Sequence, residues 1–164
     1  MAEFPDAQVR AKLYAFLRGR RLGVLTSLGP DGAPQSALMN IAVTPDLEII
    51  FETTCETRKF ANIERDPRVS LVIGCDGQES VQYEGRATRP QGQARERLRD
   101  VFVAAFPAKA ADEYWPGNHY FLVTPVWLRF SSYYRPRRVE EYRFAPEAAP
   151  HPGLLARLRD HLGG

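Results

Sequence analysis

Apolar residues follow two periods along this chain, and the two periods predict the order of its helices and strands. From residue 6 to 19 they recur every three or four positions, which predicts an amphipathic helix that begins after Asp6 and ends at Gly19. Elsewhere they mostly alternate with polar residues between turns rich in Gly, Pro and Asp, as in half-buried strands. Strands are expected at residues 22–28, 33–42, 47–53, 69–73, 81–87, 119–131 and 139–144.

Further helical segments are expected between and after these strands. A short helix has Phe60 and Ile63 on its inward face and ends before Pro67. A longer helix carries apolar residues on one face near residues 98–105, and a second helical piece reaches toward Tyr114. A terminal helix is expected at residues 152–162, after a loose linker.

The connections between the strands indicate the fold class. Most strands follow one another as hairpins and meanders and do not alternate with helices, which predicts an α+β protein with a small antiparallel barrel and helices packed outside it. Pro125 lies inside the strand at residues 119–131, and a proline there is expected at a sheet edge or a β-bulge. No repeat or linker divides the chain, so residues 1–164 are expected to form one domain.

Composition narrows the class of protein. Charged residues make up 26% and hydrophobic residues 44%, as in ordinary soluble domains, and a net charge of +2 gives no reason to expect nucleic acid or an anionic membrane as partner. No apolar run approaches the roughly 20 residues of a transmembrane helix. The N-terminus has a helical period in place of a signal-peptide core, so a cytoplasmic protein is expected.

Cysteine and histidine give no sign of a metal site. Cys55 and Cys75 form no CxxC pair and are expected to be free, buried thiols. His119, His151 and His161 lie far apart without metal-ligand spacing, so no structural metal is expected.

The chemistry of the chain is concentrated where the third strand leads into the short helix. Arg58 and Lys59 fall in the first helical turn, although a helix N-terminus already carries about half a positive charge and unpaired N–H groups. A bound anion would make the positions of both cations favourable, because each would attract it together with the helix N-terminus. The hydroxyls of Thr53, Thr54 and Thr57 could also donate hydrogen bonds to that anion. The alternative is a solvated turn with two surface cations.

Three segments carry a resemblance to a known family. They read FETTCETRKFANIERDPRVSLVI from residue 51, LTSLGPDGAPQSALMNIA from residue 25 and VQYEGRAT from residue 81. The first resembles the flavin-binding segment of the pyridoxamine 5′-phosphate oxidase-like family, and the others resemble its first two strands and its fifth. The resemblance covers residues 20–90 well, and the rest only in the order of elements. It implies an FMN-binding split β-barrel, Greek-key-like, of about six to seven strands.

The resemblance also implies roles for individual residues. Residues matching positions that hold the FMN phosphate are Thr53, Thr57, Arg58 and Lys59, with Thr54 beside them. Met39 and Asn40 lie on the strand whose backbone meets the isoalloxazine edge, and Gln82, or Ser80 on the same face, matches a side chain that faces the flavin. The family is dimeric with each flavin at the subunit interface, so Trp115 and Trp127 are aromatic candidates from the partner chain, unless they only pack in the core or interface.

Two departures argue against oxidation of pyridoxamine phosphate itself. The second strand, Ser36–Ala42, carries no cation, whereas true pyridoxamine phosphate oxidases have an arginine and a lysine there. Near the C-terminus those enzymes carry an Arg-Leu-His-Asp-Arg type of motif, and this chain has Glu140 and Glu141, which would repel a phosphorylated substrate.

Several hypotheses remain open from the sequence. The first is a homodimeric FMN flavoprotein that acts as an oxidoreductase on an unknown small molecule, with the flavin doing the chemistry, since no nucleophile–base pair or carboxylate dyad is present. The same fold could instead bind a deazaflavin (F420), whose acidic tail could meet the exposed basic run Arg135–Arg138, or haem, with His119 or a terminal-helix histidine as ligand. A third is a non-enzymatic protein that senses or stores flavin, and a fourth is a barrel without a cofactor.

Overall fold

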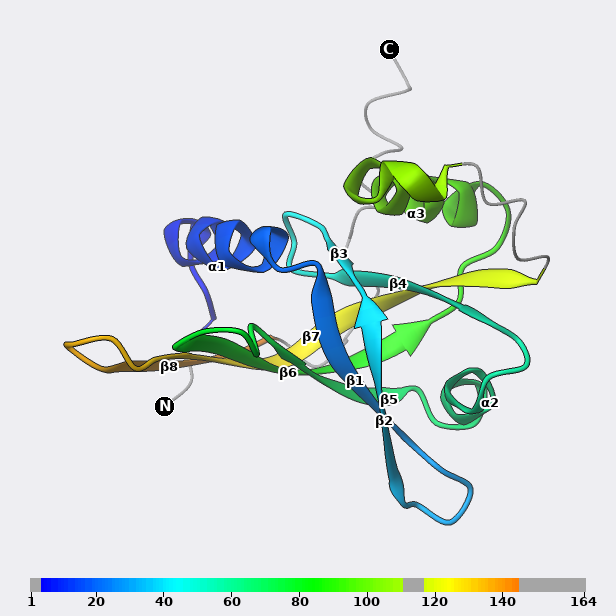
Figure 1. The fold of residues 1–164 in the computed structure, drawn as a ribbon, viewed down its shortest axis with the longest axis horizontal. Coiled ribbons are helices and arrows are strands. Elements are labelled where there is room, and N and C mark those ends of the chain that lie inside the picture. The colour runs from blue at the N-terminus through cyan, green and yellow to red at the C-terminus, as the bar shows by residue number, and fades with distance from the viewer. Residues whose placement is uncertain (1–3, 111–116, 145–164) are drawn as a thin grey trace.

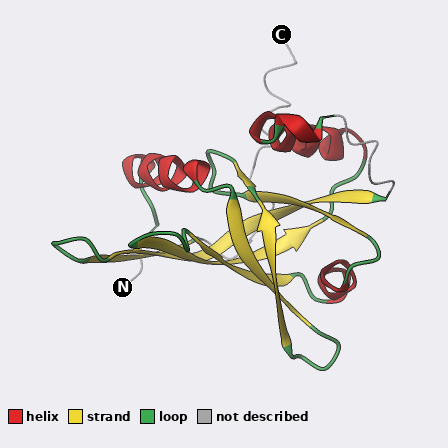
Figure 2. Ribbon diagram, viewed as in Figure 1, coloured by secondary structure: helices red, strands yellow, loops and turns green. Residues whose placement is uncertain are grey.

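Figure 1 shows one antiparallel sheet that curls into a half-open barrel, in a computed structural model that describes residues 4–110 and 117–144. In the view of Figure 1, helices α1 and α3 lie above the sheet and α2 lies at the lower right. Figure 2 shows the strands as the bulk of the described fold. The strands are β1 Leu22–Leu28, β2 Pro34–Asn40, β3 Ala42–Val43, β4 Ile49–Thr54, β5 Arg68–Ile73, β6 Glu79–Thr88, β7 Asn118–Ser132 and β8 Arg138–Arg143. The helices are α1 Ala7–Gly19, α2 Arg58–Arg65, α3 Gly92–Ala105 and the 3₁₀ turn η1 Pro107–Lys109.

The curl of the sheet follows from its strand order. That order is β2-β1-β5-β6-β7-β4-β3, with β8 paired to the outer part of β7. β2 and β3 are therefore at opposite ends of the order, although only Ile41 separates them in the chain. A flat sheet could not bring those two ends together, so the sheet bends round until they meet. The expected α+β barrel with peripheral helices is confirmed.

The same one-residue break corrects the expected strand at residues 33–42. Ile41 donates its N–H to the carbonyl of Arg21, outside the β1–β2 ladder, and is buried at the point where the chain changes partners. The result is two strands in place of one, and eight strands within the described residues. Periodicity could not show the break, because Ile41 fits the alternation of both strands.

Pro125 lies at a β-bulge, one of the two positions expected for it. β7 pairs with β6 on one side, and on its other side with β4 as far as Val123 and with β8 from Trp127, so Pro125 lies in the gap between those two ladders. Gly85 pairs with Pro125 while Glu84 pairs with Trp127, which leaves Val126 as the extra residue. A Cβ on Gly85 would lie 2.6 Å from the carbonyl oxygen of Thr124, so this close approach requires glycine.

Two apolar clusters position the elements around the barrel. The interior cluster is capped by α1 through Leu13 and Leu17, and the hydroxyl of the buried Tyr83 lies 3.0 Å from the carbonyl oxygens of both Leu47 and Val123, where its one proton can be shared between them. A second cluster lies on the outer side of β4 and the first half of β7, where α3 covers it with Leu98 and Phe102. The remaining outer face of the sheet, over β2, β1, β5 and β6, has no helix packed on it among the described residues.

Other expectations meet the structure as follows. The helix at residues 6–19 is confirmed as α1, with the Asp6 carboxylate accepting the N–H of Val9 as N-cap at 2.8 Å. Cys55 and Cys75 are free as expected, but both are exposed, because they lie in the turns after β4 and β5 and not in those strands. The terminal helix at residues 152–162 lies outside the described residues, and of the helical piece toward Tyr114 only η1 lies within them. Within the described ranges, no helix has the length and apolar character to cross a membrane.

Candidate functional site

The turn between β4 and α2 holds two threonine hydroxyls in contact. The hydroxyl of Thr57 donates to the carbonyl of Thr54 at 3.0 Å and lies 2.9 Å from the hydroxyl of Thr53. A hydroxyl has one proton to donate, so Thr57 accepts from Thr53. Thr57 is the N-cap residue of α2, yet its side chain caps no helical N–H, since it is committed to Thr54. The N–H groups that open α2 therefore have no side-chain acceptor in the described part of the chain.

Two cations lie on this uncapped helix end. Arg58 is exposed and Lys59 is half-buried, and the first turn of α2 contains no acidic residue. Burial lowers the pKa of Lys59 below its usual value, and the neighbouring guanidinium of Arg58 lowers it further. Within the described residues neither side chain makes an ion pair or a hydrogen bond, and the exposed Glu56 in the same turn pairs with neither. The turn therefore gathers positive charge and hydrogen-bond donors, and no acidic side chain among the described residues pairs with its two cations.

The buried carboxylate of Glu52 does not pair with Arg58 or Lys59. Glu52 precedes Thr53 on β4, and because side chains alternate along a strand it points to the opposite face. Its carboxylate accepts from Lys109 of η1 and from Asn118 at 3.0 Å. The charge of Glu52 is therefore already matched on the side of the sheet that carries α3.

A histidine that the sequence suggested only as a haem ligand lies beside the hydroxyl pair. His119 on β7 is the register partner of Thr53, and its ring centroid lies 5.1 Å from that of Phe60 on α2. The guanidinium of Arg89 lies over the ring of Phe60, 5.2 Å from its centroid, and forms an ion pair with Glu64 at 2.8 Å. Burial lowers the pKa of His119, and the cations Arg89 and Arg95 lower it further against the opposing effect of Glu64. The imidazole therefore contributes a neutral donor or acceptor next to Thr53.

The residues expected to meet the flavin ring lie on another part of the sheet. Met39 is half-buried against the interior cluster, while Asn40 is half-exposed and points to the outer face. Gln82 is exposed on the outer face of β6, with Val72 and Arg129 as register partners. The structure therefore brings Asn40 and Gln82 to one face of the sheet, on strands separated by β1 and β5, and leaves Met39 on the other side.

The tryptophans are not brought to the turn within one chain. Trp127 is half-buried on β7 beside the bulge, with Glu84 and Arg143 as register partners. It is eight residues from His119 along the same strand, a separation of roughly 27 Å at the usual rise per residue. Trp115 lies outside the described residues.

Exposed apolar side chains gather on the open outer face near Gln82. Leu38, Val24, Val72 and Gln82 form one register row across β2, β1, β5 and β6, and Leu22 begins the next row. Leu38 is 66% exposed and Val72 is 41% exposed. Such a row on the solvent side of a sheet is unusual in a monomer, because that side is normally polar.

Comparisons with known proteins agree with this architecture. Residues 9–132 match the family described as pyridoxamine 5′-phosphate oxidase. A haem-binding protein from Mycobacterium smegmatis is similar in structure, with a TM-score of 0.71 and 18% identity over 85% of this chain, which spans 58% of that protein. General stress protein 26 from Bacillus anthracis has a TM-score of 0.65 and 19% identity over 84% of this chain and 99% of that one. An F420 reductase has a TM-score of 0.56 and 19% identity over 70% of this chain and 93% of that one.

Proposed function

The chain belongs to the pyridoxamine 5′-phosphate oxidase family, and from that premise we propose that it binds FMN through the turn between β4 and α2. One observation carries the proposal: the hydroxyl pair of Thr53 and Thr57 lies at an uncapped helix N-terminus, and Arg58 and Lys59 follow it without an anionic partner in the described residues. A phosphate would accept from these groups and would offset the mutual repulsion of the two cations.

The ring of the flavin belongs on the open outer face of the sheet. Asn40 and Gln82 supply polar groups there, and the apolar row of Leu38, Val24 and Val72 supplies a dry surface. We propose that a second copy of the chain covers this face, so that two equivalent flavin sites form at a homodimer interface. Trp127, and Trp115 from the segment outside the described residues, then belong to the partner's contribution, because Trp127 cannot reach the turn of its own chain.

The proposed activity is an oxidoreductase reaction on a small molecule in the cytoplasm. The flavin supplies the electron transfer when bound, and the chain holds the phosphate, orients the ring and excludes water. Pyridoxamine phosphate is not the proposed substrate. The outward side chains of β2 are Ser36, Leu38 and Asn40, without a cation, and β8 presents Glu140 and Glu141.

The test compares FMN with riboflavin, which has the same ring and no phosphate. In a titration followed by flavin fluorescence, the Arg58→Ala/Lys59→Ala protein is expected to lose tenfold or more in FMN affinity, since a charged hydrogen bond contributes about 1.5–3 kcal/mol. Its affinity for riboflavin should not change. Lys12→Ala/Arg18→Ala is the matched control, because it removes two exposed cations from α1, which contributes nothing to the turn between β4 and α2. Unchanged FMN affinity in the first double variant would refute the phosphate assignment.

The absorption spectrum of the purified protein separates the remaining candidates. Flavin bands support the proposal, a Soret band indicates haem, and uptake of F420 in preference to FMN indicates a deazaflavin protein. Bleaching of bound FMN by NAD(P)H or by a substrate distinguishes an enzyme from a protein that only senses or stores the flavin.

A further inference from the structure

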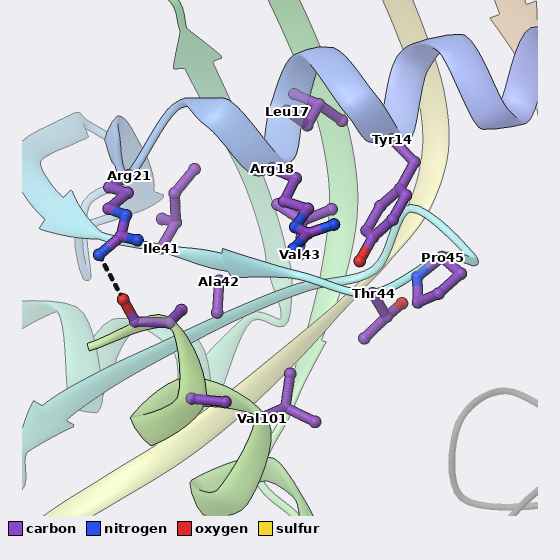
Figure 3. Close-up of a pocket in the computed structure, with 12 residues that line it drawn as sticks. Tyr14, Leu17, Arg18, Arg21, Ile41, Ala42, Val43, Thr44, Pro45 and Val101 are labelled. Atoms are coloured by element: carbon purple, nitrogen blue, oxygen red, sulfur yellow. Dashed lines mark hydrogen bonds between the residues drawn. The ribbon is translucent and has the colours of Figure 1, made fainter. Parts of the chain in front are cut away.

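A pocket of about 440 Å³ lies between α1, β3 and α3 (Figure 3). Its floor is the buried stretch Ile41–Thr44, which runs from the break between β2 and β3 into the following turn. Its walls are Tyr14, Leu17 and Arg18 on one side and Val101, Ala104 and Ala105 on the other. None of the residues expected to bind FMN lines it.

The pocket exists because two helices flank β3 with small side chains between them. α1 packs on the interior cluster through Leu13 and Leu17, whereas α3 packs on the second cluster through Leu98 and Phe102. The two helices thus belong to different apolar cores. The alanines at positions 104 and 105 leave the space open where larger side chains would fill it.

The polar side chains that line the pocket are the cations Arg18 and Arg21 and the hydroxyls of Tyr14 and Thr44. Arg21 donates to the carbonyl of Ala105, as the dashed line in Figure 3 marks, and its guanidinium lies 5.6 Å from the ring centroid of Phe106. Arg18 is exposed and makes no ion pair or hydrogen bond within the described residues. No acidic side chain lines the pocket: the nearby Asp46 is paired with Arg10 at 3.6 Å, and the buried Glu48 accepts from the hydroxyl of Thr44 at 3.3 Å. The apolar part of the floor therefore lies beneath two arginines, Arg18 and Arg21, that form no ion pair with a carboxylate among the described residues.

We propose that this pocket binds a small amphipathic organic anion: a monocarboxylate whose head group pairs with Arg18 and whose apolar body lies on Ile41, Val43 and Val101. Its volume lies within the range of about 300–1,000 Å³ that is usual for small-molecule sites. The combination of apolar side chains with a few polar groups in the lining is also typical of such sites. The proposal is independent of flavin binding, since the two sites share no residue.

The test is calorimetric titration of the full-length protein with decanoate, octanoate and decyltrimethylammonium. Decanoate should bind, octanoate should bind more weakly because it buries less apolar surface, and the cation should not bind. Arg18→Ala should weaken decanoate binding by about tenfold or more, as expected for a charged hydrogen-bonded pair. Lys12→Ala is the matched control, because Lys12 is an exposed cation on α1 that does not line the pocket, and it should bind decanoate as the parent does.

A second variant tests the pocket itself. Ala104→Trp places a large ring at an exposed lining position and should abolish decanoate binding without lowering the thermal midpoint of unfolding. Leu38→Ser removes apolar surface from the open face of the sheet and should leave decanoate affinity unchanged. The proposal is overturned if decanoate fails to bind, or if it binds Arg18→Ala and Ala104→Trp as tightly as the parent.

Discussion

His119 lies beside the turn between β4 and α2 through a pairing that joins residues far apart in the sequence. Thr53 and His119 face each other across β4 and β7, and Phe60 of α2 contacts the imidazole. Local signals, two cations and a threonine at a helix start, were sufficient to predict Thr57, Arg58 and Lys59 as a candidate site. The placement of His119 depends on strand register, which a single sequence does not contain, and no periodic or compositional signal marks it.

The lowered pKa of His119 predicts a pH dependence of stability. The native state binds the proton more weakly than the unfolded chain, so stability is full above the ordinary value of about 6.5 and falls as the pH drops through the lower native pKa. Urea unfolding at pH 7.5 and 5.5 measures the loss, and His119→Gln should reduce it. Carboxylates such as Asp66, with a pKa of about 2, lose their contribution only at lower pH. An equal loss in the variant would show that His119 is not its source.

At the scale of the element, α2 begins in a way that weakens the helix. Its N-cap Thr57 makes no capping hydrogen bond, its first turn carries cations, and no acid compensates for them in that turn. An ordinary helix start would have the reverse charge and a capping oxygen. This local conflict is what made the site visible in the sequence.

A single substitution at the helix start should separate stability from binding. Thr57→Asp supplies a capping carboxylate next to Arg58 and Lys59, so the free energy of unfolding should rise by about 1 kcal/mol. The same charge would repel a phosphate, so FMN affinity should fall. Thr57→Ser keeps the hydroxyl and should change neither quantity much. Chemical denaturation and FMN titration of both variants measure the two effects, and a stabilised Asp variant with undiminished FMN affinity would contradict the proposed site.

Elements with strong local signals were predicted well, and their long-range relations were not. The helix after Asp6 and the strand at residues 22–28 appear as α1 and β1, because period and caps are local properties. The break at Ile41 and the exposure of Cys55 depend on which strand pairs where and on where each turn begins. A bulge at Pro125 was one of two expected outcomes, and the register shift between β6 and β7, which a single sequence does not contain, establishes it.

At the scale of the whole molecule, the open outer face of the sheet, on which no described helix packs, is the surface that the proposed second copy would cover. Polar residues expected to meet the flavin share this face with the apolar row that includes Leu38 and Val72, whereas Trp127 lies far along β7 from the turn. A flavin whose phosphate is held by the turn would leave its ring against an uncovered surface. A second copy related by two-fold symmetry would cover that surface twice, once for each site.

Disrupting the apolar row should therefore change the oligomeric state of the protein and its affinity for FMN together. Leu38→Asp/Val72→Lys places charges on the face, and sedimentation velocity should show a shift from dimer to monomer, because an interface core does not accept unpaired charges. FMN affinity should fall in parallel, although the turn with Arg58 and Lys59 is untouched. Val139→Ser is the matched control, since Val139 is an exposed apolar residue on β8, outside the row, and its loss should leave both quantities unchanged. A monomeric double variant that binds FMN as tightly as the parent would show that one chain holds the whole flavin, and a double variant that stays dimeric would place the interface elsewhere.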